Sequence, residues 1–358
     1  MTSISDPLSF AHGPSMPNRV MLAPLTNQQS HADGTLSDEE HRWLTMRANG
    51  GFGLTMTCAA HVQRVGQGFA GQLGIFGDEH LEGLTRLARD LNAAGTVSYV
   101  QLHHAGLDAP VEVIGTTPVS ASDDDATGAR AMRTDEVEQV SRDFVAAARR
   151  AQRAGFHGVE LHGAHGYLIG QFLSAATNRR TDRYGGTFDN RCRLLLDIVE
   201  GVRAECGDGL ALAVRLSGER FGIDTDEMRE LFVRLADTGS IDLIDMSLWH
   251  VDKEPLSEHH RGRRLIELFA ELPRGATRLA VAGHLRTPTA LQRALDDGAD
   301  VVAVGRGGIL HHDFARRAAD PDWVPRTPPA TESDLVAEGV SPAFMGYLRR
   351  RFEGFVQG

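Results

Sequence analysis

The chain has 358 residues, of which 41% are hydrophobic and 24% charged, and its formal net charge is −11. This length suits one large α/β barrel or two average domains, and the hydrophobic content is enough for a sizeable core. The negative charge argues against a nucleic-acid-binding surface and against binding to an anionic membrane.

Segments for membrane insertion, secretion or disulfide bonding are not indicated. No apolar run approaches the roughly 20 residues that a membrane-spanning helix needs. The first ten residues, MTSISDPLSF, have neither the basic start nor the apolar core of a signal peptide. The wide spacing of Cys58, Cys192 and Cys206 fits neither a disulfide framework nor a CxxC metal or iron–sulfur motif. We therefore expect a cytoplasmic protein.

Short apolar runs that are typical of buried parallel strands recur along the chain. In chain order they are RVMLAPLT, FGLTMTCAA, TVSYVQLHH, GVELHGAH, LALAVRLSG, IDLIDMSLW, RLAVAGHL and DVVAVGRGG. Eight strand–helix cycles over roughly 290 residues predict a (β/α)₈ TIM barrel. A doubly wound sheet is the rival fold, but its glycine fingerprint is missing after the first strand, which ends in Ala23-Pro24-Leu25-Thr26.

Amphipathic helices are predicted between these strands. Residues 78–95 and 134–155 have apolar residues at helical spacing, and a glycine ends each segment. Thr287-Pro288 opens a further helix that Gly298 closes.

Two segments lie outside the strand–helix alternation. Residues 107–133 form an excursion after the third strand, with the run Asp123-Asp124-Asp125, and we expect a solvated loop there. We place the barrel at about residues 17–323 of a single domain spanning residues 1–358. The tail, residues 324–358, is rich in proline at first, and PAFMGYLRRRFEGF then predicts one more helix.

Polar residues gather at the predicted carboxyl ends of the strands, where TIM barrels carry their functional groups. A single histidine or arginine at a strand end is usually a packing or salt-bridge residue, so the signal is their convergence on one mouth. The residues concerned are Thr26, Cys58, Gln101, His103, His104, His162, His165, Tyr167, Arg215, Trp249, Gly283, His284, Gly305 and Arg306.

The ends of the last two strands, AVAGHLRT and AVGRGGIL, resemble a phosphate site. Gly283, Gly305 and Gly307 allow close backbone approach, and Arg306 supplies a bidentate cation. Glycines that serve tight turns only are the alternative explanation. We therefore expect a ligand that carries a phosphate.

Two further strand-end residues fit a flavin ring. Gln101 offers a donor and an acceptor to a ring edge of alternating N–H and C=O groups. Arg215 supplies a fixed positive charge beside the pyrimidine edge, which gathers negative charge when a flavin is reduced.

Four motifs resemble the old yellow enzyme family of FMN-dependent ene-reductases. They are NRVMLAPLTNQQSHADGTLS, YVQLHHAG, HGAHGYLIGQFLSAATNRRTDRYGGTFDNRCR and GADVVAVGRG, and they occur in the expected order from about Pro7 to Trp323. The single-domain members match better than the larger members that carry an iron–sulfur cluster. The resemblance implies FMN as cofactor and NAD(P)H as hydride donor, with the choice between NADH and NADPH left open.

The resemblance also implies roles for individual residues. Cofactor binding falls to Pro24, Leu25, Thr26, Cys58, Gln101, Arg215, Gly283, Gly305 and Arg306. His162 and His165 are expected to bind the carbonyl oxygen of an electron-poor alkene. Tyr167 is expected to give the proton that the α-carbon of the alkene receives. This fits the chemistry, because two donors stabilise an enolate oxygen and a phenol with a pKa near 10 stays protonated at neutral pH.

Four positions depart from the common family pattern. Leu107 stands where many members have arginine, and Gln28 stands where some have a substrate-lining tyrosine. Cys58 replaces a glycine or alanine, so its side chain is expected to crowd or tune the ring. Thr26, rather than cysteine, indicates redox tuning by a hydrogen bond.

Other functions remain open at this point. The same fold can serve a flavin-dependent amine or ketone dehydrogenase, or a flavin-binding protein without activity. A metal-dependent barrel hydrolase is a rival of another class, with Glu160, His162 and His165 as ligands. Relatives often lend a C-terminal arginine to a neighbour's active site, so YLRRRF also predicts a homo-oligomer.

Overall fold

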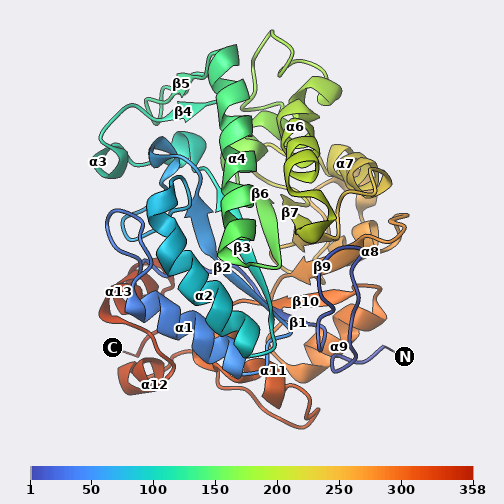
Figure 1. Ribbon diagram of the computed structural model, residues 1–358. Helices are drawn as coiled ribbons and strands as arrows, with labels where there is room; N and C mark the ends of the chain where they lie inside the picture. The colour runs from blue at the N-terminus through green and yellow to red at the C-terminus, as the bar shows by residue number, and fades with distance from the viewer. Residues whose placement is uncertain (1, 358) are drawn as a thin grey trace.

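The computed structural model describes residues 2–357 and contains a closed barrel of parallel strands (Figure 1). Around the barrel the strand order is β1-β10-β9-β8-β7-β6-β3-β2. The strands are β1 (Val20–Leu22), β2 (Leu54–His61), β3 (Val97–His103), β6 (Gly158–Gly163), β7 (Ala211–Ser217), β8 (Leu243–Ser247), β9 (Arg278–Ala282) and β10 (Val301–Val304). The predicted TIM barrel is confirmed, and each predicted strand contains or overlaps one of these.

The strands are apolar on both faces because each face is covered. Their outward side chains join the large core under the helices, and their inward side chains form a second cluster that fills the amino end of the barrel. Leu8 and Met16 belong to this second cluster and pair with each other as an antiparallel bridge. The N-terminal segment therefore seals one end of the barrel, which leaves the carboxyl ends of the strands for a site.

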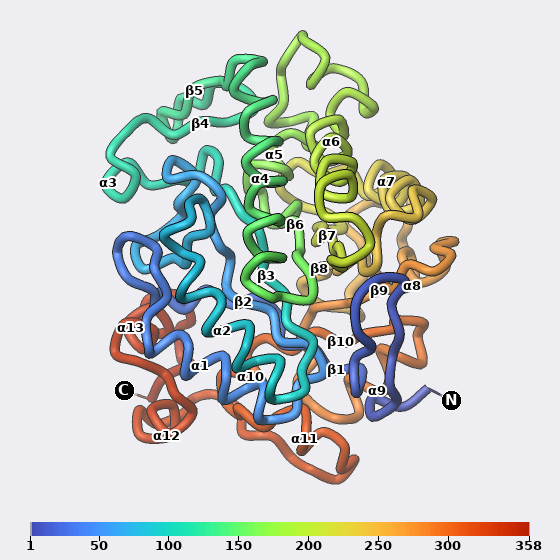
Figure 2. The backbone as a smooth tube through the Cα atoms, viewed as in Figure 1, coloured from blue at the N-terminus to red at the C-terminus, as the bar shows by residue number. Residues whose placement is uncertain are grey.

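Helices surround the barrel, and α4 and α6 lie side by side on its outside (Figures 1 and 2). The helices are α1 (Asp38–Asn49), α2 (Leu81–Ala93), α3 (Val111–Ile114), α4 (Thr134–Ala154), α5 (Leu168–Leu173), α6 (Phe188–Cys206), α7 (Thr225–Asp237), α8 (Leu265–Ala270), α9 (Pro288–Asp296), α10 (Arg306–Leu310), α11 (Phe314–Arg317), α12 (Glu332–Ala337) and α13 (Pro342–Arg351). The predicted helices at 78–95, 134–155 and 287–298 correspond to α2 with a short 3₁₀ turn before it, α4 and α9. None of the helices within residues 2–357 has the length and apolar character needed to span a lipid bilayer.

The excursion after β3 is not the simple solvated loop that we expected. It contains α3 and a small two-stranded sheet of β4 (Val119–Ser120) and β5 (Arg130–Ala131). Val119, Ser120 and Ala121 are buried, because Ser120 Oγ donates to Gln171 Oε1 over 2.9 Å and Arg180 Nη1 donates to the Ala121 carbonyl over 3.1 Å. Polar partners from α5 and from the loop that follows it therefore hold this segment on the barrel.

The predicted C-terminal helix is confirmed as α13, and it packs on the barrel rather than extending into solvent. Phe344, Met345 and Leu348 are buried, and the Phe344 ring meets the Trp43 ring edge-on with centroids 5.6 Å apart. The short helix α12 was not predicted. Its six residues span too little sequence for a clear amphipathic pattern.

Gly158, the first residue of β6, is required by close packing inside the barrel. A Cβ there would lie 2.5 Å from Tyr99 Cε1 and 2.8 Å from the Ala211 carbonyl oxygen. Gly158→Ala should therefore lower the free energy of unfolding by about 1–3 kcal/mol through overpacking. Urea unfolding followed by circular dichroism measures this. Gly346→Ala is the matched control on α13, where a Cβ meets only the flexible Arg350 Nη1 at 3.2 Å, and its stability should not fall. Equal stability of the two variants would contradict the packing argument.

Candidate active site

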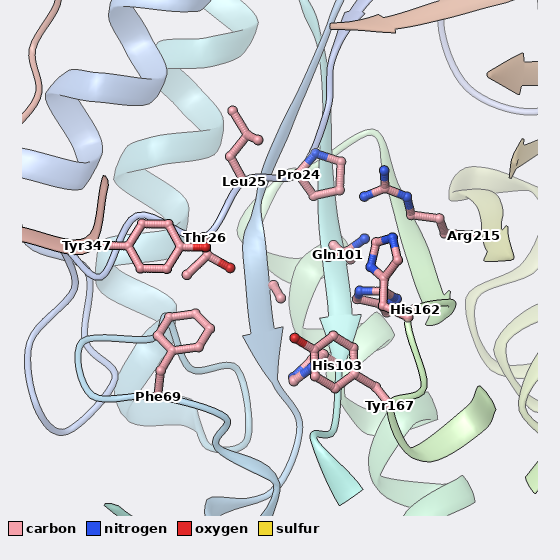
Figure 3. Close-up of a pocket in the computed structure, with 12 residues that line it drawn as sticks. Pro24, Leu25, Thr26, Phe69, Gln101, His103, His162, Tyr167, Arg215 and Tyr347 are labelled. Atoms are coloured by element: carbon pink, nitrogen blue, oxygen red, sulfur yellow. The ribbon is translucent and has the colours of Figure 1, made fainter. Parts of the chain in front are cut away.

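A cavity of about 180 Å³ opens at the carboxyl end of the barrel. Figure 3 shows Tyr347 and Phe69 on one side of it and Arg215 and His162 on the other. Its lining residues are Pro24, Leu25, Thr26, Ala59, Phe69, Gln101, His103, His162, His165, Tyr167, Arg215 and Tyr347. The structure thus brings together the predicted residues from the ends of β1, β3, β6 and β7.

Strand register sets the polar floor of this cavity. Gln101 on β3 pairs with Glu160 on β6, and Arg215 on β7 lies between His162 on β6 and Asp245 on β8. Because neighbours in register point to the same side of a sheet, these side chains meet inside the barrel.

Arg215, the one arginine in the cavity lining, forms an ion pair with a carboxylate below the cavity. Arg215 Nε lies 2.9 Å from Asp245 Oδ2, and both residues are buried. Gln101 Nε2 donates to Glu160 Oε1 over 2.7 Å, which leaves the amide oxygen of Gln101 free to face the cavity. Burial, and then the Asp245 carboxylate, raise the pKa of Glu160 above its usual range, so this carboxyl favours its neutral form. A fixed, oriented guanidinium therefore remains next to the cavity.

His162 and His165 are both neutral at pH 7. Burial lowers the pKa of His165 to about 3 and lowers that of His162 well below its usual range. His162 Nδ1 accepts from the Ala164 N–H over 3.3 Å, which puts the ring proton on Nε2. His165 has a left-handed backbone (φ 62°), its N–H donates to Ser217 Oγ over 2.9 Å, and its Nε2 lies 2.8 Å from Ser247 Oγ. Both rings are fixed by neighbours, and within residues 2–357 the Nε2–H of His162 has no acceptor.

Tyr167 follows these histidines and caps α5 (Leu168–Leu173). Its ring lies edge-on to His162 with centroids 5.1 Å apart, and 6.4 Å from the His165 ring. Burial raises the pKa of Tyr167 to about 12, so its hydroxyl is protonated at every physiological pH. The three predicted catalytic residues therefore surround one space.

A second polar region lies at the ends of β9 and β10. Burial, and then repulsion from Arg286, lower the pKa of Arg306, whose Nη2 lies 3.1 Å from His284 Nε2, and within residues 2–357 no carboxylate forms an ion pair with either arginine. A Cβ on Gly305 would meet only Leu25 Cδ2 at 3.5 Å, whereas one on Gly283 would lie 3.0 Å from the backbone nitrogen of His250. Two adjacent cations beside an open glycine fit an anion such as a phosphate. Arg286 was not among the predicted residues.

Cys58 does not face the cavity, contrary to the expectation that its side chain would crowd the ring. The register of β2 against β3 shifts between Met56 and Ala59, and this irregularity brings Ala59 to the cavity wall. The Cys58 thiol instead donates to Glu40 Oε1 over 2.8 Å, and burial raises the pKa of both groups. The Cys58 side chain is therefore buried behind the cavity wall and does not line the cavity.

Gln28 is not among the residues that line the cavity, although a substrate-lining role was expected. Its backbone is left-handed (φ 57°), and its Oε1 accepts from Arg350 Nη2 of α13 over 2.9 Å. The same helix brings Tyr347 to the cavity, which it lines together with Thr26. Sequence reasoning missed Phe69, which lies at no strand end and in no motif, and it gave Tyr347, the first residue of YLRRRF, no role in the cavity.

Leu107, the last of the departures, lines a neighbouring cavity that shares His165 and Tyr167 with the first. A metal site formed by Glu160, His162 and His165 is not supported. Within residues 2–357, the single group of side chains with ligand atoms close enough to hold a metal ion is Asp226, His259 and His260 on the surface.

Comparison with known proteins agrees with this geometry. The NADH:flavin oxidoreductase / NADH oxidase family matches residues 4–321. A probable NADH-dependent flavin oxidoreductase of Bacillus subtilis is 31% identical over 92% of this chain and 89% of its own length. The old yellow enzyme homologue from Zymomonas mobilis has a TM-score of 0.81 and 29% identity over 95% of this chain and 99% of that one. Morphinone reductase in complex with tetrahydroNAD has a TM-score of 0.79 and 29% identity over 94% of both chains.

The barrel fold and the residues at the carboxyl ends of its strands are therefore those of an NAD(P)H-dependent flavin oxidoreductase. The chain belongs to the NADH:flavin oxidoreductase / NADH oxidase family, within which its resemblance is to the old yellow enzymes. FMN is its cofactor and NAD(P)H its hydride donor. The residues present fit this cofactor, because they supply an oriented amide and a buried guanidinium at the cavity, and two arginines without a carboxylate partner in residues 2–357 beyond the ends of β9 and β10.

The pair Arg286 and Arg306 should act on the phosphate of FMN alone. Arg306→Ala, or Arg286→Ala, should weaken FMN binding at least tenfold, since a charge-assisted contact contributes about 1.5–3 kcal/mol. Binding of riboflavin, which lacks the phosphate, should stay within about twofold of the parent. Fluorescence titration of the cofactor-stripped protein with both flavins measures this. If FMN and riboflavin lost affinity equally, the arginines would not act on the phosphate.

Proposed function

We propose that this protein reduces the activated C=C bond of α,β-unsaturated carbonyl or nitro compounds, with hydride from NAD(P)H passed through FMN. The observation that carries the proposal is the grouping of two neutral imidazoles and one protonated phenol in a cavity that also contains Gln101 and Arg215. When bound, FMN supplies the hydride that reaches the β-carbon. The residues of the chain then have three tasks.

The first task is to hold the flavin. Gln101 and Arg215 are assigned to its pyrimidine edge, where the free amide oxygen of Gln101 accepts and the guanidinium of Arg215 donates. Pro24, Leu25 and Thr26 follow β1 and form one wall of the cavity, so we assign them to the ring face and its edge. Gly305, Arg286 and Arg306 are assigned to the phosphate.

The second task is to polarise the substrate carbonyl. His162 presents Nε2–H, and His165 presents Nδ1–H when Ser247 donates to its Nε2. Two neutral donors strengthen their bonds as the carbonyl oxygen gains negative charge, which is the preorganised stabilisation of an oxyanion. Neutral imidazoles suit this task because no counter-charge has to be displaced.

The third task is to deliver a proton to the α-carbon. Tyr167 is protonated at neutral pH because of its raised pKa, and it lies beside the histidine pair. A protonated acid of this kind gives a proton to a carbanion more readily than it removes one from a substrate. Tyr167 is therefore in the form that reduction of an alkene needs.

A homo-oligomer stays a prediction. Two arginines of α13 donate hydrogen bonds within their own chain, Arg349 to Glu332 and Arg350 to Gln28, and Arg351 lies near Tyr347. These contacts account for the basic helix without a neighbouring subunit.

Tyr167→Phe should separate the proton-transfer step from all others. Flavin reduction by the nicotinamide should stay near the parent rate, while reoxidation by cyclohexenone should slow by roughly 10² to 10⁴, the usual size of general-acid catalysis. Stopped-flow absorbance of the two half-reactions measures both rates. Nitrocyclohexene is the control substrate, because its anion is stable without prompt protonation. Unchanged reoxidation by cyclohexenone would exclude Tyr167 as the acid.

His162→Ala and His165→Ala should affect binding as well as rate. Each removes one donor to the ligand oxygen, so phenol should bind about tenfold more weakly, and reoxidation by an enone should slow by a larger factor because those bonds strengthen in the transition state. Titration of the bound flavin's absorbance with phenol gives the affinity. An unaltered phenol affinity in both variants would refute the oxyanion role.

A further inference from the structure

A third imidazole, which the reaction above does not use, faces the same cavity. His103 is the last residue of β3 and lines the cavity beside Tyr167 (Figure 3). Its ring centroid is 4.5 Å from that of Tyr167 and 5.5 Å from that of His162. Burial, and then the other histidines, lower its pKa well below the usual range, so it is neutral.

Gln72 fixes which ring nitrogen of His103 carries the proton. The Gly68 N–H donates to Gln72 Oε1 over 2.6 Å, and this sets the orientation of the amide. The amide nitrogen of Gln72 then donates to the Ala59 carbonyl over 2.9 Å and to His103 Nδ1 over 3.0 Å. Since Nδ1 accepts, the proton of a neutral ring is on Nε2.

The Nε2–H of His103 has no acceptor within residues 2–357, where its ring makes the Gln72 bond and no other. Because His103 lines the cavity and Gln72 fixes its orientation, this N–H is presented to a ligand atom in the cavity. His104, the next residue, is the opposite case, because both its nitrogens are used within the protein, by the Gly106 N–H and by Gln63 Oε1.

We propose that His103 Nε2–H binds a second oxygen of the substrate, so that the preferred substrates are uncharged alkenes with a carbonyl at each end, such as enediones and maleimides. This inference rests on the proposed function, in which His162 and His165 bind the first oxygen. An uncharged substrate is favoured because all three imidazoles are neutral and Arg215 is paired with Asp245. Gln72 is a positioning residue in this arrangement.

The reaction balances without any further reactant. The enedione takes a hydride at one alkene carbon, through FMN from NAD(P)H, and a proton from Tyr167 at the other carbon. The C=C π bond breaks, two C–H bonds form, and NAD(P)H is oxidised to NAD(P)⁺. Solvent reprotonates Tyr167.

The test compares two substrates that differ by one carbonyl and cannot tautomerise to a phenol, 5,5-dimethylcyclohex-2-ene-1,4-dione and 5,5-dimethylcyclohex-2-enone. The enedione is intrinsically more reactive, so only the change in the ratio of the two kcat/KM values between variants counts. His103→Phe keeps a ring but removes the donor, and this ratio should fall about tenfold, which corresponds to one hydrogen bond. His103→Gln restores an N–H donor and should recover most of the ratio. His157→Gln is the control and should leave the ratio unaltered. His157 directly precedes β6, at the amino end of the barrel, where its Nδ1 accepts from the Ser98 N–H.

A binding measurement accompanies the kinetics. Calorimetry should show that cyclohexane-1,4-dione loses affinity relative to cyclohexanone in His103→Phe and regains it in His103→Gln. A ratio in His103→Phe within twofold of the parent, or no recovery in His103→Gln, overturns the inference. The inference is also overturned if the parent protein prefers fumarate to dimethyl fumarate and this preference depends on His103. In that case His103 would bind the substrate carboxylate as a cation. A parent protein that reduces neither cyclic compound refutes the proposed function itself.

Discussion

The ion pair between Arg215 and Asp245 is the interaction on which the mouth of this barrel depends. A guanidinium cannot be buried among strand ends without a nearby anion, and the register of β7 against β8 places Asp245 directly beside it. With its charge balanced from below, Arg215 can be held rigidly against a ligand above. Removal of Asp245 would leave an uncompensated buried cation, so the ligand site and the stability of the barrel cannot be separated at this point.

A second consequence of burial is that the cavity works with neutral donors. His103, His162 and His165 all lose their usual tendency to gain a proton, and Tyr167 loses its tendency to release one. Each ring is then held in place by a short-range partner, such as a backbone N–H for His162 or Gln72 for His103. The site therefore depends on orientation more than on net charge, as expected where charge develops only during the reaction.

Much of this arrangement could be predicted from the sequence, because the signals are local. Apolar runs identified the strands, and strand ends identified Gln101, His162, Tyr167 and Arg215 as neighbours. The failures have a different physical origin. The register shift in β2 turned Cys58 away from the cavity, and alternation along a strand does not reveal such an irregularity. Phe69, Arg286 and Gln72 lie in loops, and their positions depend on tertiary contacts. The excursion after β3 looked polar in composition, but its backbone is held by Arg180 from a distant loop.

The contact between Gln28 and Arg350 joins residues that are 322 positions apart in the sequence. Closure of the barrel already requires β10 to return to β1, and α13, which follows β10 in the chain, packs on the loop after β1. Pairings this distant are the slowest to form, since a long loop must be closed before any contact contributes. On the ribosome, the wall that carries Tyr347 is therefore added last. A nascent chain in which α13 has not yet packed would therefore leave the cavity without the side that Tyr347 forms in the folded protein.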